Sequence, residues 1–344
     1  MNRNLNFFLK FLLALLPVLF IILYTAFFPM YYQDTDYPSW KYTKDIQSGK
    51  GGIYGDGEGK GGEEGYREKD FKTIIIGDSA AMADLKPTCM SDDCINLAIG
   101  GATSIEMYYT LRDYIENVGC PENVVIMFSP FHYSYIDNYW TRSIYFHHFS
   151  ITDAIKTYTE GRKLKADTFN DGEHDLFSLL SMYLRLPDSY LPALINARFF
   201  LRYEDNSLRL KELDESRGQY HFGTMDGCDY LNYESNYTEF KTDGDHPILD
   251  EYMIKILRLC QENAVNITVS QPPMNTASYE SLNDDYLSQY FEYIEGLSVY
   301  YPEGIYETEI PEYDNKYFGD ASHLNDEGAK KFSEEFALRY KDMF

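Results

Sequence analysis

Residues 71–79 read FKTIIIGDS, a short β-branched run followed by a glycine, an aspartate and a serine. A continuous apolar run of this length is typical of a strand that is buried on both faces in a parallel sheet. The run ends in Gly77-Asp78-Ser79, so we expect the strand to deliver Ser79 into a turn at its carboxyl end. In open α/β sheets this edge binds ligands. The segment therefore predicts an α/β fold with a candidate functional serine at the sheet edge.

Other periodic segments extend this α/β pattern along the chain. Short apolar runs predict further strands of one parallel sheet over residues 95–97, 124–128 and 266–270. Apolar residues at helical spacing predict helices over residues 105–117, 175–185, 191–203, 254–259 and 327–340. Asn325 or Asp326 can cap the last of these helices.

The N-terminal region carries a membrane signal. Residues 11–28, FLLALLPVLFIILYTAFF, are uncharged and long enough to cross about 30 Å of hydrocarbon as a helix. Arg3 and Lys10 precede the run, and the positive flank of a membrane helix normally stays in the cytoplasm. We therefore expect residues 1–30 to be a cytoplasmic stub and a single plasma-membrane anchor, with the remainder extracellular. A cleaved signal peptide is the alternative, but no small-residue cleavage site follows the run.

The segment after the anchor is glycine-rich and charged. Residues 49–65 read GKGGIYGDGEGKGGEEG, which contains too little apolar surface to offset the entropy of ordering it. We therefore expect a flexible linker over residues 31–70 and an outer domain over residues 71–344. Within that domain, the irregular, aromatic stretch from about residue 134 to 245 is expected to be an insertion over the sheet.

Charge and cysteine content exclude several classes of ligand. The formal net charge is −25, so phosphates would be repelled over most of the surface, and we expect no nucleic-acid partner. The five cysteines show no CxxC pair or His-rich spacing, so we expect no metal site and no cofactor. Outside the cytosol, Cys89 and Cys94 could close a small disulfide loop or remain reduced.

Three residues form a candidate catalytic set: Ser79, His323 and Asp320. A serine hydroxyl needs an imidazole to remove its proton and a carboxylate to orient that imidazole. Asp320 and His323 lie three residues apart before a predicted helix, so one loop can turn both toward one point. Either motif alone is commonly a strand-end turn or a helix cap. Their combination favours catalysis.

Three stretches resemble blocks of the SGNH (GDSL) hydrolase superfamily: IIIGDSAAMADL at residues 74–85, NLAIGGAT at 96–103 and DASHLNDEGAKKF at 320–332. The resemblance implies a flavodoxin-like, three-layer α/β sandwich and a Ser-His-Asp acyl-transfer mechanism. It also implies an oxyanion hole formed by the backbone N–H groups of Ser79 and Gly101.

The superfamily's GxND block, which supplies an oxyanion-hole asparagine, is not recognisable; residues 124–132 read VVIMFSPFH. This departure resembles membrane-tethered members of the superfamily that act in D-alanyl transfer to teichoic acid. This resemblance implies that the partner is a membrane-bound O-acyltransferase. It also implies that the substrate is the O-acyl groups of an envelope polysaccharide or teichoic acid. Ser129 and His132 are candidates to contact substrate in place of the asparagine.

Alternative interpretations stay open at the level of sequence. Asp245-His246 could be a second acid-base pair, although a helix start also explains Asp245. Gln271 could contact substrate or lie in a plain loop. The same fold would suit a non-catalytic scaffold that binds polysaccharide or the acyltransferase, or a lipid esterase with an apolar acyl groove.

Overall fold

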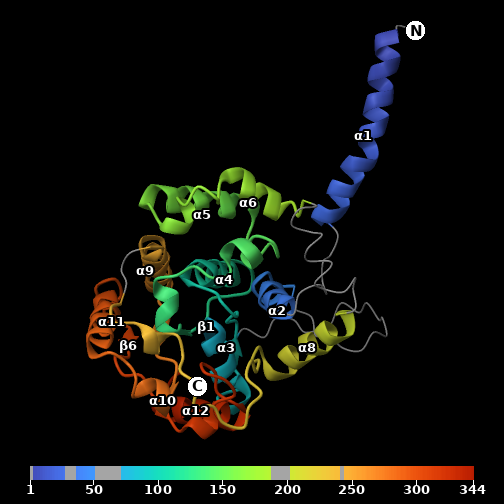
Figure 1. Ribbon diagram of the computed structural model, residues 1–344. Helices are drawn as coiled ribbons and strands as arrows, with labels where there is room; N and C mark the ends of the chain where they lie inside the picture. Colours follow the sequence, from blue (N-terminus) through green and yellow to red (C-terminus); the bar gives the residue numbers. More distant parts are fainter. Residues whose placement is uncertain (1–2, 28–35, 51–70, 187–201, 241–243) are drawn as a thin grey trace.

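The computed structural model describes residues 3–27, 36–50, 71–186, 202–240 and 244–344. Helix α1 (Arg3–Phe27) begins before the predicted apolar run and is long and apolar enough to span a membrane. Within this helix, the window Asn4–Ile21 has a mean hydropathy of 2.0, and none of it is buried. Figure 1 shows this helix standing apart from the folded domain.

A five-stranded parallel sheet forms the centre of the domain, in the order β2-β1-β3-β4-β6. Its strands are β1 (Thr73–Gly77), β2 (Cys94–Asn96), β3 (Asn123–Met127), β4 (Asn266–Ser270) and β6 (Ile305–Tyr306). This order, 2-1-3-4-5 along the chain, is that of flavodoxin-like doubly wound sheets. The predicted α/β class with a parallel sheet is confirmed, and β6 was missed because two residues carry no readable periodicity. A separate parallel pair joins β5 (Met274–Asn275) to β7 (Glu312–Tyr313).

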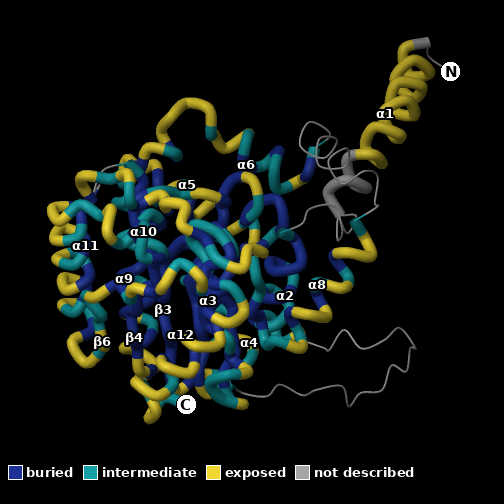
Figure 2. Tube along the Cα trace, turned by 60° about the horizontal axis from the view of Figure 1, so that its bottom comes forward, coloured by how far each residue is buried: buried dark blue, intermediate teal, exposed yellow. Residues whose placement is uncertain are grey.

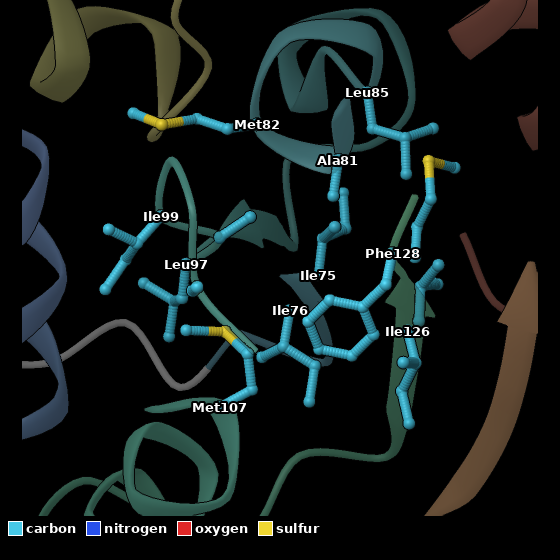
Figure 3. Packing of buried hydrophobic residues seen from close by; sticks show 14 of the residues in the cluster. Ile75, Ile76, Ala81, Met82, Leu85, Leu97, Ile99, Met107, Ile126 and Phe128 are labelled. Atoms are coloured by element: carbon cyan, nitrogen blue, oxygen red, sulfur yellow. The ribbon is translucent and has the colours of Figure 1, made fainter. Parts of the chain in front are cut away.

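Helices cover both faces of the sheet. Helices α4 (Ser104–Asn117) and α9 (His246–Glu262) lie on one face, and α3 (Ser79–Asp84) and α12 (Asp326–Arg339) lie on the other. Successive side chains of a strand point to opposite faces. In Figure 3, Ile75 accordingly points toward Ala81 of α3, whereas Ile76 points toward Met107 of α4. Figure 2 shows the buried strands inside and the exposed turns of the helices outside.

Helix α2 (Tyr37–Gln47) corrects the prediction of a flexible linker over residues 31–70. Its side chains pack into the main core, where Trp40 is 1% exposed, and the helix contacts α4 and α8 (Tyr203–Ser216). The prediction was wrong for residues 37–47 because it extended the glycine-rich composition of residues 49–65 back over a short aromatic segment that forms a helix. Residues 51–70, which hold most of that run, lie outside the described residues.

The predicted insertion packs mainly on helices. Helices α5 (Ile151–Leu164) and α6 (Leu176–Tyr183) contact each other, and α5 also contacts α9. Figure 1 shows them as a layer outside α4 and α9, while α8 lies beside α2. Most of the helix predicted over residues 191–203 lies outside the described residues. Two further helices, α10 (Thr276–Tyr279) and α11 (Asp284–Gly296), precede β6.

Two local predictions have different outcomes. Asn325 caps α12, because its side chain accepts a hydrogen bond from the N–H of Gly328. Cys89 and Cys94 are free thiols, so the possible disulfide loop is not formed. Cys94 lies in β2, where its side chain is buried in the main core, whereas Cys89 is partly exposed.

Candidate active site

The turn after β1 presents Ser79 at the edge of the sheet. Gly77 is required there because a Cβ atom would collide with the carbonyl oxygen of Met127 on β3. Asp78 then caps α3, since its carboxylate accepts a hydrogen bond of 2.9 Å from the N–H of Ala80. Ser79, the first residue of α3, is partly exposed. The turn lies between β1 and β3, the switch point at which doubly wound sheets bind ligands.

The loop before α12 holds the imidazole and its carboxylate together. Nδ1 of His323 lies 2.9 Å from each carboxylate oxygen of Asp320. The Oδ1 atom of Asp320 also accepts from the N–H groups of Ser322 and His323, at 2.8 Å each. The loop is fixed to the end of α3, where the N–H of Leu324 donates to Oδ1 of Asp84 at 2.8 Å.

These contacts decide the chemical state of the pair. Burial favours a raised pKa for the Asp320 carboxyl, but hydrogen bonding to His323, the charge of that imidazole and the loop N–H groups lower it below its ordinary value. Asp320 is therefore ionised at neutral pH and orients Nδ1–H toward itself. Nε2 of His323 is buried and has no hydrogen-bond partner in the described part of the chain, so this nitrogen is available to a substrate or to Ser79.

Ser79 and His323 line the same hollow, which has a volume of about 220 Å³. The sheet edge forms one wall, and residues of α2, α8 and the segment that carries Tyr220 and Phe222 form the other. The ring of Phe222 packs against the imidazole of His323, with centroids 4.9 Å apart. The structure therefore brings the three predicted catalytic residues together: two face the hollow, and Asp320 supports His323 from behind.

Gly101 lies beside Ser79 in the same hollow. Its φ of +69° is in the left-handed region, which favours glycine, and a Cβ atom there would collide with the amide of Asn138. Neither Ser79 nor Gly101 donates its backbone N–H to an acceptor within the residues described. Both N–H groups are therefore available to bind an oxyanion.

Asn138 is a site residue that no sequence motif indicated. It follows the 3-10 turn after β3, at the start of the predicted insertion, and lines the hollow next to Gly101. Its Nδ2 donates to the carbonyl of Gly100 at 3.1 Å, and its Oδ1 accepts from Arg142 at 2.6 Å. A side-chain amide has two N–H donors, so one remains available toward the hollow. The sequence contains no signal for Asn138, because the chain between β3 and this residue is irregular. Its distance from the strand in sequence therefore does not predict its position at the sheet edge.

Ser129 and His132, the predicted substrate contacts, lie behind the nucleophile turn and not among the residues that line the hollow. The N–H of Ser129 donates to Oδ2 of Asp78 at 2.7 Å, and Nδ1 of His132 lies 2.6 Å from the same oxygen. The SPFH segment therefore binds the carboxylate that caps α3. The physical reason is that β1 and β3 are adjacent, so the turns that follow them meet.

The other open candidates have structural partners. Asp245 accepts from the N–H of Thr168 at 2.8 Å, and Nδ1 of His246 lies 2.9 Å from the carbonyl of Tyr133. Gln271 is buried and donates to the carbonyl of Glu307 at 2.8 Å. None of these side chains lines the hollow with Ser79.

Within the residues described, no group of three or more His, Cys, Asp or Glu side chains is arranged to hold a metal ion. Comparisons of the chain with models of protein families, with curated proteins and with solved structures found no match. A functional assignment therefore depends on the geometry of the hollow and on the sequence motifs.

Proposed function

We propose that the chain is a membrane-anchored, SGNH-type serine acyltransferase or esterase that acts on O-acyl groups of a cell-envelope polysaccharide or teichoic acid. The observation that carries the proposal is the shared hollow: Ser79 and His323 line it together, and Asp320 holds Nδ1 of the imidazole at 2.9 Å. A nucleophile, a base and a group that orients the base are the parts that acyl transfer requires.

The reaction proceeds in two half-reactions. Nε2 of His323 takes the proton of the Ser79 hydroxyl while Oγ forms a bond to the acyl carbonyl carbon. The N–H groups of Ser79 and Gly101, with the second amide N–H of Asn138, stabilise the oxyanion. His323 then gives its proton to the leaving alcohol oxygen, and an acyl ester remains on Ser79. In the second half-reaction, His323 takes the proton of an acceptor hydroxyl or water as its oxygen attacks the ester carbon. His323 then gives that proton to the leaving Oγ, which restores the Ser79 hydroxyl and the neutral imidazole.

The size of the hollow supports a short acyl group over a lipid chain. Its volume of about 220 Å³ is below the roughly 300–1,000 Å³ of pockets that enclose drug-sized ligands. Leu213, Tyr220 and Phe222 supply apolar wall, enough to pack a group such as acetyl. Faster hydrolysis of acetyl than of long-chain esters is the expected outcome, and the reverse order would favour the lipid esterase.

The anchor supports a place of action at the plasma membrane. Arg3 and Lys10 lie at the N-terminal end of α1, which favours a cytoplasmic N-terminus and an extracellular domain. Tethering next to the membrane suits a partner that exports acyl groups, and we propose a membrane-bound O-acyltransferase for this role, on the resemblance described above.

A fluorophosphonate probe tests the proposal directly, since it reacts with activated serines. The full-length protein in detergent micelles should become labelled, and Ser79→Ala should abolish the labelling. Ser322→Ala is a matched control, because only the backbone N–H of Ser322 contacts Asp320. Mass spectrometry of the envelope from cells with Ser79→Ala should show altered O-acylation. Wild-type protein that stays unlabelled, and a Ser79→Ala variant that preserves O-acylation, would support the non-catalytic scaffold instead.

A further inference from the structure

A second histidine–carboxylate pair lies directly behind the nucleophile turn. The carboxylate of Asp78 is fully buried and accepts hydrogen bonds from the N–H groups of Ala80, at 2.9 Å, and Ser129, at 2.7 Å. Nδ1 of His132 lies 2.6 Å from Oδ2 of the same carboxylate, and the imidazole is only 9% exposed. His132 is thus joined to the residue that immediately precedes Ser79.

The other edge of the imidazole faces the loop that carries Gly101. Oδ2 of Asp137 lies 3.9 Å from Nε2 of His132. The same oxygen lies 2.7 Å from the point that a Cβ atom on Gly101 would occupy, so Asp137 packs against that glycine. The next residue, Asn138, donates to the carbonyl of Gly100. His132 therefore lies between the turn that carries Ser79 and the loop that carries Gly101, both of which line the hollow.

The charges around His132 hold a proton on it. Asp78 and Asp137 are the carboxylates next to the ring, and the charge of His132 also acts on the buried carboxyl of Glu234. Burial favours a lowered pKa for His132, but the neighbouring carboxylates of Asp137 and Asp78 raise it to about 10. Burial raises the pKa of Glu234, whose Oε1 accepts from the N–H of Phe131, so this third carboxyl tends toward its neutral form. A doubly protonated ring donates a hydrogen bond to Asp78 through Nδ1–H, and its positive charge attracts the carboxylate of Asp137 across 3.9 Å.

We propose that His132 is a positioning residue, a buried cation that fixes the nucleophile turn and the Gly101 loop against each other. Its effect is to make the N–H groups of Ser79 and Gly101 converge on one oxyanion. The inference rests on the proposed function for its effect on rate. A displacement of about 1 Å in a catalytic group can lower a rate by about a hundredfold, so such a link matters even though His132 touches no substrate.

Three variants and a control test the inference in the full-length protein. His132→Asn keeps an N–H donor near Asp78 but loses the charge and the link to Asp137, and His132→Leu loses both. Asp137→Asn alters a half-exposed side chain, so folding should survive even where His132 variants fail to fold. His148→Asn is the control, since His148 is equally buried but bonds to the hydroxyl of Thr110.

The rate readout separates positioning from stability. We expect fluorophosphonate labelling and kcat for p-nitrophenyl acetate to fall about tenfold to a hundredfold in His132→Asn, and further in His132→Leu, with little change in KM. Asp137→Asn should lower both about threefold to tenfold, and His148→Asn should leave both unchanged. Unchanged rates in folded His132→Asn and Asp137→Asn would overturn the inference.

A second readout does not depend on activity. In ¹⁵N NMR of histidine-labelled protein, the His132 ring should remain doubly protonated to about pH 9, below its pKa of about 10. Asp137→Asn should shift this titration to lower pH. His132→Leu should speed amide exchange at Ala80 and Ser129, whose N–H groups donate to Asp78. A neutral His132 at pH 7 would overturn the inference whether or not the protein labels. A protein that keeps this imidazolium and never labels would instead refute the proposed function alone.

Discussion

Two histidine–carboxylate pairs flank Ser79, and they differ in what surrounds them. His323 and Asp320 lie in a loop beside the hollow, where the Asp320 side chain is 39% exposed. His132 and Asp78 lie behind the turn, where the Asp78 side chain is fully buried. In both pairs Nδ1 meets a carboxylate, and in both Nε2 has no hydrogen-bond partner in the described part of the chain. The pairs are therefore alike in connectivity and different in setting.

The surroundings of the two imidazoles distinguish the proposed base, His323, from the proposed structural cation, His132. A general base must release its proton within each turnover, so its second nitrogen must face the reacting group and no further anion. His323 lines the hollow with Ser79, and its unpartnered Nε2 suits the proposed role of base. Nε2 of His132 faces the carboxylate of Asp137, so the ring holds its proton and links two segments. One additional carboxylate, Asp137, thus distinguishes the proposed positioning pair from the proposed catalytic pair.

The largest expected effect comes from removing the base. His323→Ala should reduce kcat by up to about a millionfold, because it removes the proposed proton acceptor of the Ser79 hydroxyl. Measuring burst-phase ester hydrolysis and probe labelling by the same sample would check this. If His132→Ala proved as damaging as His323→Ala in a protein of equal stability, the distinction between the two pairs would collapse.

The second effect concerns stability and lies with the buried pair. Asp78→Asn leaves the His132 imidazolium without its buried partner, which should lower the free energy of unfolding by about 3–5 kcal/mol. Asp320→Asn, at the more exposed pair, should change stability much less while still lowering kcat. Urea denaturation of both variants would measure the contrast. Equal losses of stability would show that burial does not distinguish the pairs.

A third expected effect tests whether Asn138 belongs to the oxyanion hole. Asn138→Ala removes an amide donor beside Gly101, and the loss of one oxyanion donor typically lowers kcat about a hundredfold to a thousandfold. The hydrogen bond to Gly100 is lost as well, so Asn138→Asp, which keeps size and adds charge, is the comparison. We expect kcat to decrease from wild type to Asn138→Ala and to be lowest in Asn138→Asp. A rise in KM with an unchanged kcat would place Asn138 outside the oxyanion hole.

The smallest effect is a pH dependence of stability with opposite signs at two buried histidines. The folded-state pKa of His132 is raised from 6.5 to about 10, so its stabilisation is complete below pH 6.5 and is lost as pH rises toward 10. Burial lowers the pKa of His148 to about 3, so stability there is lost as pH falls below 6.5. Thermal midpoints of wild type, His132→Asn and His148→Asn should be measured between pH 4 and 10. The loss of stability at alkaline pH should disappear in His132→Asn, and the loss at acidic pH should disappear in His148→Asn.

The sequence determined those features that depend on neighbouring residues. Apolar runs predicted β1 and β3, because strands buried on both faces need continuous apolar residues. The three-residue spacing of Asp320 and His323 predicted their contact, and Asn325 was one of two predicted caps, because each interaction closes within one turn of chain.

Only the tertiary structure decided which distant segments complete the site. Trp40 packs against the ring of His148, and Thr43 donates to the carbonyl of Leu97, contacts that no local pattern can specify. Asn138 reaches Gly101, and His132 reaches Asp78, for the same reason. The free energy of these contacts comes from burial and charge pairing across a folded core, so they follow from the packing of whole elements and not from the residues beside them in sequence.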